Sequence, residues 1–140
     1  MRITILSFVL LLFSSCSKGP VAIHYSKDDC DFCKMTIMDN RFSCQCQSTK
    51  GKNFKFDDAF CMISFLKNDG NWKNEVEGIY FSDFSGNDQW ITSDNSFLLK
   101  SDKLKSPMGG NVAAFSRDEA RDSVFNIIGG EKTDWNKIKQ

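Results

Sequence analysis

Histidine is almost absent from this sequence of 140 residues, because His24 is the only one. An HExxH metal site needs two histidines and is therefore excluded. The sequence also lacks a Ser-His-Asp set, a glycine-rich phosphate loop and a paired-carboxylate hydrolase signature. These absences leave little from which a catalytic site could be built, so the sequence predicts that the protein is not an enzyme.

A net charge is also lacking, since 18 basic residues balance 18 acidic ones. Nucleic acids and anionic membrane surfaces attract proteins with a clear excess of Lys and Arg. The balance therefore gives no case for nucleic-acid binding or for polybasic attachment to a membrane. The length is that of one domain, or of two very small units that share a core.

One apolar run stands out, at the N-terminus, where residues 3–13 follow the positive charge of Arg2. The run is too short to span a membrane and is typical of an export signal. Small residues directly before Cys16 resemble a bacterial lipobox. We expect residues 1–15 to be a lipoprotein signal peptide and Cys16 to be acylated, which would tether the protein to a membrane from outside the cytoplasm. An ordinary cleaved signal with a chance Cys is the alternative.

Cysteine is abundant, and five cysteines remain when Cys16 is set aside. An odd number leaves at least one thiol unpaired, and metal ligation is a good reason for a free thiol in an oxidising compartment. Soft sulfur donors are concentrated in one short stretch: Cys30, Cys33, Met35 and Met38. Such donors select Cu(I), whereas a structural zinc site needs more thiolate or imidazole ligands. A disulfide and a redox dithiol remain the alternatives.

Two residues outside this stretch are further candidate ligands. Met108 lies in Ser106-Pro-Met-Gly-Gly110, where Pro and Gly exclude a regular element and can hold a thioether at the surface. A chance turn residue is the alternative, but together with the sulfur-rich stretch a metal role is the better interpretation. His24 is either a further ligand or an ordinary strand residue.

Alternation predicts a β-hairpin after the sulfur-rich stretch. Phe42, Cys44 and Cys46 alternate with polar residues, so we expect a strand with both cysteines facing the core. A turn at residues 48–53 and a second alternating run at residues 54–56 complete the hairpin.

A helix and a further strand complete the first unit. Asp57 is expected to cap a helix over residues 58–67, in which core packing is the default role of Cys61. Residues 79–84 are the next strand.

A second unit repeats this order. Strands are expected at residues 89–92 and 111–115, followed by a helix that begins with a capping box at Ser116 and Glu119 and ends at Gly129. Residues 132–135 are expected to form the last strand. The predicted fold class is α+β, with two similar small ββαβ units packed together. The predicted boundaries are 16–27 for a tether, 28–86 for the first unit and 87–140 for the second.

Four motifs in this order cover nearly all of the expected mature chain. They are Asp29-Cys30-Asp-Phe-Cys33-Lys-Met35-Thr-Ile37, Phe56-Asp57-Asp58 with Cys61-Met62, Tyr80-Phe-Ser-Asp83-Phe with Trp90-Ile91, and Pro107-Met108-Gly109 with Ala114-Phe115. Together they resemble the NosL family, the accessory lipoproteins of nitrous oxide reductase. The set of four is far more specific than any one of them.

The resemblance implies a periplasm-facing lipoprotein that binds one Cu(I). It would deliver the ion to nitrous oxide reductase, for its copper-sulfide centre, or to a related cuproprotein. By position, the family's metal-binding residues match Cys30 and Met108, with Asp29 adjacent, while Cys33 and Met35 belong to the same motif as Cys30. Lys34 stands where the family more often has Gly. The resemblance also implies two homologous ββαβ units.

Two other functions stay open from the sequence. A thiol-disulfide oxidoreductase would place its CxxC at the start of a helix after a strand. Here Cys30 precedes the first clear strand, and the carboxylates of Asp28, Asp29 and Asp31 are expected to raise rather than lower its pKa. A non-catalytic lipoprotein with paired cysteines would contain two disulfides and bind no copper.

Overall fold

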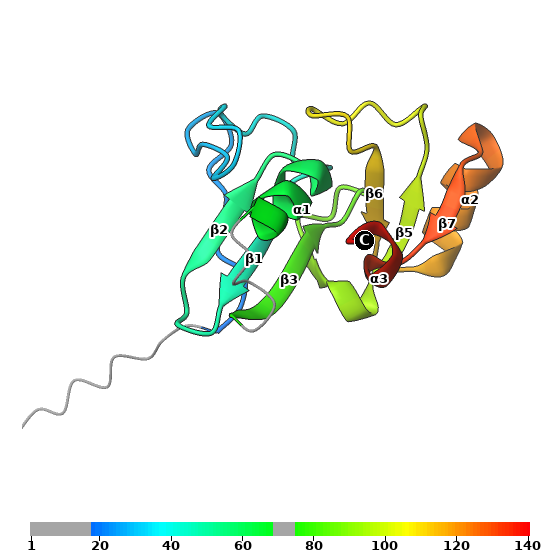
Figure 1. Ribbon diagram of the computed structural model, residues 1–140. Coiled ribbons are helices and arrows are strands. Elements are labelled where there is room, and N and C mark those ends of the chain that lie inside the picture. Colours follow the sequence, from blue (N-terminus) through cyan, green and yellow to red (C-terminus); the bar gives the residue numbers. More distant parts are fainter. Residues whose placement is uncertain (1–17, 69–74) are drawn as a thin grey trace, which may run out of the picture.

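The computed structural model describes residues 18–68 and 75–140, and it contains two small antiparallel sheets with helices packed against them (Figure 1). The elements are β1 (Cys44–Ser48), β2 (Asn53–Phe56), α1 (Ala59–Asn68), β3 (Val76–Ser82), β4 (Trp90–Thr92), β5 (Phe97–Lys100), β6 (Val112–Phe115), α2 (Asp118–Ile128), β7 (Glu131–Thr133) and α3 (Trp135–Ile138). The predicted signal peptide and the lipidation site Cys16 lie outside the described residues.

The two sheets follow one plan, which confirms the predicted α+β class. The first has the order β2-β1-β3-β4 and the second the order β6-β5-β7. In each, a central strand pairs with the next strand along the chain and then, after a helix, with the strand on its other side. The predicted order of strand, strand, helix and strand therefore occurs twice.

The strand at residues 90–92 does not belong to the second unit, and the prediction that it does is wrong. β4 pairs with β3 at the edge of the first sheet, with Phe81 opposite Ile91. Ile91 is buried in the first core cluster, which gives this strand its reason to join the first sheet.

The first strand of the second unit is β5, which the sequence pattern missed. Leu98 and Leu99 are both fully buried, one in each of the two core clusters. A strand buried on both faces does not alternate between apolar and polar residues, so its period cannot be recognised.

The cores of the two units are joined. Leu98, Val112 and Ala114 from the second unit lie in the core cluster of the first, and Phe42 lies in that of the second. The Phe84 ring of the first unit packs against the Phe115 ring of the second, with 5.4 Å between the centroids. The units therefore cannot bury their apolar faces separately.

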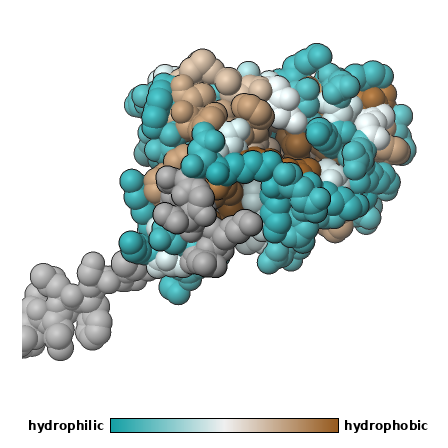
Figure 2. Space-filling view, in the orientation of Figure 1, coloured by the Kyte–Doolittle hydropathy of each residue, from teal (hydrophilic) through white to brown (hydrophobic). Residues whose placement is uncertain are grey.

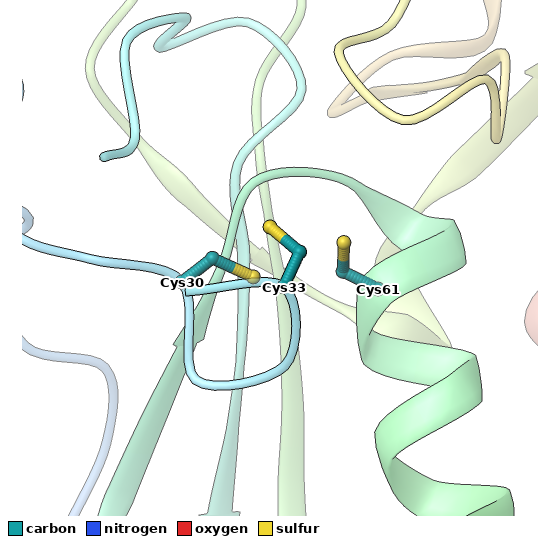
Figure 3. Close-up of side chains that lie close together, drawn as sticks. All are labelled: Cys30, Cys33 and Cys61. Atoms are coloured by element: carbon teal, nitrogen blue, oxygen red, sulfur yellow. The ribbon is translucent and has the colours of Figure 1, made fainter. Parts of the chain in front are cut away.

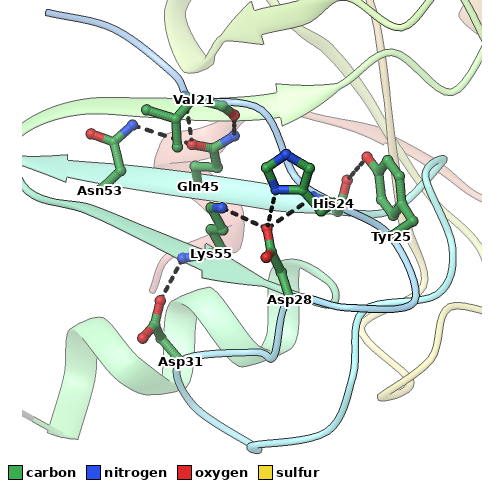
Figure 4. Close-up of polar contacts among 9 residues, drawn as sticks. Val21, His24, Tyr25, Asp28, Asp31, Gln45, Asn53 and Lys55 are labelled. Carbon is green, nitrogen blue, oxygen red and sulfur yellow. Dashed lines mark hydrogen bonds and ion pairs between the residues drawn. The ribbon is translucent and has the colours of Figure 1, made fainter. Parts of the chain in front are cut away.

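The segment before the first strand is packed against the sheet and is not a free tether over the part described. The Gln45 side chain accepts a hydrogen bond from the Val21 N–H and donates one to the Val21 carbonyl (Figure 4). The Gln47 side chain makes the same pair of bonds with Gly19. Both glutamines are buried, on the face of β1 opposite Cys44 and Cys46, which point into the core as predicted. The side-chain amides of Gln45 and Gln47 thus bond to the backbone of Val21 and Gly19 as the backbone of a neighbouring strand would.

Both predicted helix caps are wrong in detail. Asp58, rather than Asp57, caps α1, because its Oδ1 accepts a hydrogen bond from the Cys61 N–H at 3.1 Å. Ser116 makes no cap bond to α2, since its hydroxyl donates to the carboxylate of Asp83 in the first unit. In both places a contact between distant parts of the chain decides the role of the side chain.

Figure 2 shows that hydrophilic residues cover much of one face, with hydrophobic residues exposed at the upper end of the first unit. The exposed large hydrophobic side chains include Met35, Met38 and Phe60, with exposed fractions of 48%, 65% and 47%. Among the described residues, no helix is both long enough and apolar enough to cross a membrane.

Candidate metal centre

The loop that carries Cys30 and Cys33 is a tight turn closed by backbone hydrogen bonds. The Lys34 N–H donates to the Cys30 carbonyl at 3.0 Å, and the Cys30 N–H donates to the Met35 carbonyl at 2.8 Å. Lys34 has a φ of 64°, in the left-handed region that glycine adopts most easily. The loop therefore holds a lysine in a backbone conformation that suits glycine.

Two aspartates fix this loop to β2 through Lys55 (Figure 4). Asp28 accepts a hydrogen bond from the Lys55 Nζ at 2.6 Å and one from the His24 N–H at 2.8 Å. Asp31 accepts one from the Lys55 N–H at 2.7 Å, and its own N–H donates to the Lys55 carbonyl at 2.8 Å. These carboxylates anchor the loop to the sheet.

Three sulfur atoms meet where this loop lies beside the first turn of α1. The Sγ atoms of Cys30, Cys33 and Cys61 all lie within 4.8 Å of one another (Figure 3). Cys30 and Cys61 are fully buried, whereas Cys33 is half-buried. All five described cysteines are free, which does not support the structural lipoprotein with two disulfides.

Cys30 is the acidic thiol of the cluster. A hydrogen bond from the Cys61 thiol, aided by backbone N–H groups of Phe32, Cys33 and Asp57, lowers the pKa of Cys30 from its ordinary 9.0 to about 5. The prediction that neighbouring aspartates raise this pKa is wrong. Asp28 and Asp31 accept hydrogen bonds from Lys55, whereas backbone N–H groups donate to the Cys30 sulfur.

The other two thiols of the cluster hold their protons more firmly. Burial raises the pKa of Cys33, and donation of its proton to Cys30 raises that of Cys61. One thiolate and two thiols therefore share the site at neutral pH. The remaining cysteines are core residues: burial raises the pKa of Cys46 to about 12 and that of Cys44 well above its ordinary value.

Asp57 places a buried carboxyl group next to the cluster. Its Oδ1 is buried and has no hydrogen-bond partner among the described residues. Burial, followed by the negative charges of Cys30, Asp58 and Asp39, raises the pKa of Asp57 to about 6.

The loop that carries Met108 is attached to α1 through Asp58, which is fully buried. The Asp58 Oδ2 accepts hydrogen bonds from the Ser106 Oγ at 2.7 Å and from the Met108 and Gly110 N–H groups at 3.1 Å each. Met108 packs against the core cluster that contains Cys30 and Cys61. In Figure 1 this loop, in yellow, lies at the same end of the molecule as the blue loop of the sulfur-rich stretch.

Two predicted ligands lie at the surface. Met35 is exposed, and Asp29 is also exposed, with its carboxylate accepting a hydrogen bond from the Thr36 hydroxyl. His24 lies beside Asp28, with 3.5 Å between the Nδ1 and a carboxylate oxygen. Among the described residues, the group of potential ligands around Cys30 contains neither Asp29 nor His24.

Cys61 is the residue that the sequence reasoning assigned to the core alone. It is buried as expected, but its sulfur lies beside those of Cys30 and Cys33 (Figure 3). The signal that could have revealed it is the motif Phe56-Asp57-Asp58 with Cys61-Met62, in which a helix cap and a thiol occur together.

Three close sulfur atoms, partly buried and held by separate elements, define a protein able to bind a soft metal ion. The NosL family model matches residues 20–140, so the chain belongs to the NosL family. The crystal structure of the copper chaperone NosL from Shewanella denitrificans has the same fold, with a TM-score of 0.75 and 22% sequence identity over 89% of this chain and 98% of that one. No curated protein matches the chain significantly.

Proposed function

We propose that this protein is an extracytoplasmic Cu(I) carrier, and that the ion binds at Cys30, Cys33 and Cys61. The approach of three Sγ atoms to within 4.8 Å is the observation that carries the proposal. Cu(I) is bound by two to four soft ligands. Cys30 supplies a thiolate at neutral pH, so a first bond to the ion needs no prior deprotonation.

We assign different roles to the three predicted ligands outside this cluster. Met108 is a candidate thioether ligand because its loop is fastened to the residue that caps the helix of Cys61. Met35 follows Cys33 closely in the loop but is exposed, so we assign it to the approach of a partner. Asp29 makes a hydrogen bond with Thr36 and is a weaker candidate.

Membership of the NosL family supports the rest of the proposal. The carrier would deliver copper for the copper-sulfide centre of nitrous oxide reductase, or to a related cuproprotein, by ligand exchange and without catalysing a reaction. Acylation of Cys16 would hold it at the membrane, facing the periplasm. Flotation of wild type and of Cys16→Ser with membranes tests this anchor, since only the wild type should float.

The test of copper binding is an anaerobic Cu(I) titration in competition with a chromophoric chelator. One equivalent should bind to the reduced wild type, and Cys30→Ser, Cys33→Ser and Cys61→Ser should each weaken it. Cys46→Ala is the matched control, because this buried cysteine lies outside the sulfur cluster. Met108→Leu and Met35→Leu test the two thioethers at nearly constant volume. If copper stays with the chelator in the wild type, the proposal fails.

A loaded site that includes Met108 would join the two units. Cu(I) bound by Cys30 and Met108 should then raise the melting temperature of the protein, because a ligand that binds only the folded state stabilises it. Met108→Leu should reduce this increase.

A thiol-disulfide oxidoreductase is the second candidate, favoured by the low pKa of Cys30 beside the half-buried Cys33. Its CxxC lies in a turn rather than at a helix N-terminus, which argues against it. Reduction of a disulfide substrate that is abolished by Cys30→Ser but unaffected by Cys61→Ser would favour this candidate.

A further inference from the structure

A buried carboxylate joins the two loops that approach the sulfur cluster from different units. Asp58 is fully buried, and no Lys or Arg of the described ranges 18–68 and 75–140 forms an ion pair with it. Four hydrogen-bond donors surround it instead: the Ser106 hydroxyl and the N–H groups of Cys61, Met108 and Gly110. A buried carboxylate needs hydrogen-bond donors of this kind, because burial removes the water that would otherwise solvate it.

The two oxygens of Asp58 have different partners. Oδ1 accepts from Cys61, in the first turn of α1, whereas Oδ2 accepts from three groups of the loop at residues 106–110. The backbone of Cys61 and that of Met108 are therefore bonded to one carboxylate. Hydrogen bonds to an ionised acceptor are about twice as strong as neutral ones, which suits a rigid connection.

The loop can approach Asp58 closely because residue 110 is Gly. A Cβ at this position would lie 2.8 Å from the Phe60 backbone nitrogen and 3.2 Å from the Asp58 Oδ2. The nearest of these contacts is to backbone, which cannot move aside easily. Any larger residue would push the loop away from α1.

We propose that Asp58 is a positioning residue of the copper site, which holds the loop at residues 106–110 against α1 so that the Met108 thioether can join the sulfur atoms of Cys30, Cys33 and Cys61. This inference rests on the proposed Cu(I) function. Asp58 itself does not bind the ion, since both of its oxygens are occupied. Its effect on copper passes through Met108.

The test compares Cu(I) affinity in the full chain, kept in detergent, for wild type, Asp58→Asn and Gly110→Ala. An amide at residue 58 presents N–H groups to a pocket of donors, whereas Gly110→Ala displaces the loop and leaves the carboxylate intact. Loss of the outer partner of a metal ligand costs about 10–100-fold in affinity. We expect both variants to fall in this range, with one sulfur ligand fewer by X-ray absorption.

A double-mutant cycle of Asp58→Asn and Met108→Leu distinguishes an effect through Met108 from a general loss of stability. If Asp58 acts through Met108, the double variant Asp58→Asn/Met108→Leu should bind copper as weakly as Met108→Leu alone. Asp83→Asn is the matched control, because Asp83 is also buried and also joins the units, but through Ser116. This control should retain wild-type affinity and all of its sulfur ligands.

Wild-type affinity in Asp58→Asn and Gly110→Ala, or full additivity in the cycle, would overturn the inference. If Asp58→Asn does not fold, Gly110→Ala and Ser106→Ala decide the question in the same cycle. If the wild type binds no Cu(I), the proposed function fails, and hydrogen exchange decides whether Asp58 fixes the loop. In that case faster exchange of the Met108 and Gly110 amides in Asp58→Asn would show that Asp58 holds the loop, and unchanged exchange would refute it.

Discussion

Removal of the Cys61 thiol should raise the pKa of Cys30 in the metal-free protein. The Cys61 S–H is the strongest of the hydrogen-bond donors that stabilise the Cys30 thiolate, and it acts together with the N–H groups of Phe32, Cys33 and Asp57. A hydrogen bond to a charged group contributes about 1.5–3 kcal/mol, and one pKa unit corresponds to about 1.4 kcal/mol. In Cys61→Ala the pKa of Cys30 should therefore rise by about one to two units from its value of about 5.

The assay is a pH titration of thiolate absorbance in the ultraviolet, on reduced, metal-free full chain in detergent. The pKa values of Cys33, Cys44, Cys46 and Cys61 are all raised, so near neutral pH the described cysteines contribute one thiolate, that of Cys30. Its acid-side step should move upward in Cys61→Ala. Three backbone donors remain in that variant, so the step should stay below the ordinary value of 9.0.

Two further variants control this titration. Cys61→Ser keeps a hydroxyl donor at the same place and should restore most of the wild-type midpoint. Cys46→Ala removes a thiol outside the cluster and should leave the midpoint unchanged. A wild-type protein with no thiolate near neutral pH would contradict this prediction, as would a Cys61→Ala variant that titrates as the wild type does.

Three other predictions concern the parts that hold the site. Asp57 has a pKa of about 6 in the folded protein against an ordinary 3.8, so its ionised form destabilises the fold above pH 6, and this cost disappears as the pH falls below about 4. Asp57→Asn should therefore raise the free energy of unfolding by about 1–3 kcal/mol at pH 8 and by much less at pH 4, as measured by urea denaturation; an equal gain at both values would contradict this. Gln45→Ala should cost about 1–3 kcal/mol, because two backbone groups of Val21 lose their partner, and hydrogen exchange should become faster at the Val21 amide; unchanged exchange would count against a packed N-terminal segment. Lys34→Gly should stabilise the protein by up to about 1 kcal/mol in thermal denaturation, because φ is 64° there; a clear loss of stability would mean that left-handed strain is not the dominant effect.

The sequence predicted most of the elements whose pattern is local. Alternation between Phe42 and Gln47 predicted β1 with Cys44 and Cys46 inward, and the helix expected at residues 58–67 occurs at Ala59–Asn68. β5 escaped detection because Leu98 and Leu99 are buried on opposite faces, in two different clusters. A strand that is buried on both faces has no alternation of apolar and polar residues by which it could be recognised.

The candidate site was predictable only in part, for a similar reason. Cys30 and Cys33 are close in sequence, so their spacing alone indicates a shared site. Cys61 joins them through the docking of α1, and a single buried cysteine in a helix is by default a core residue. The proposed role of Asp58 depends on contacts with residues 106–110, in the second unit, which no local pattern encodes.

For the proposed Cu(I) carrier, the burial of the three sulfur atoms implies an order of copper transfer. Cys30 and Cys61 are fully buried, whereas Cys33 is half-buried in a loop whose neighbours Lys34 and Met35 are exposed. An incoming ligand from a partner can therefore approach the ion first on the side of Cys33. Exchange there would leave the ion bound by the sulfurs of Cys30 and Cys61 until the partner has engaged it.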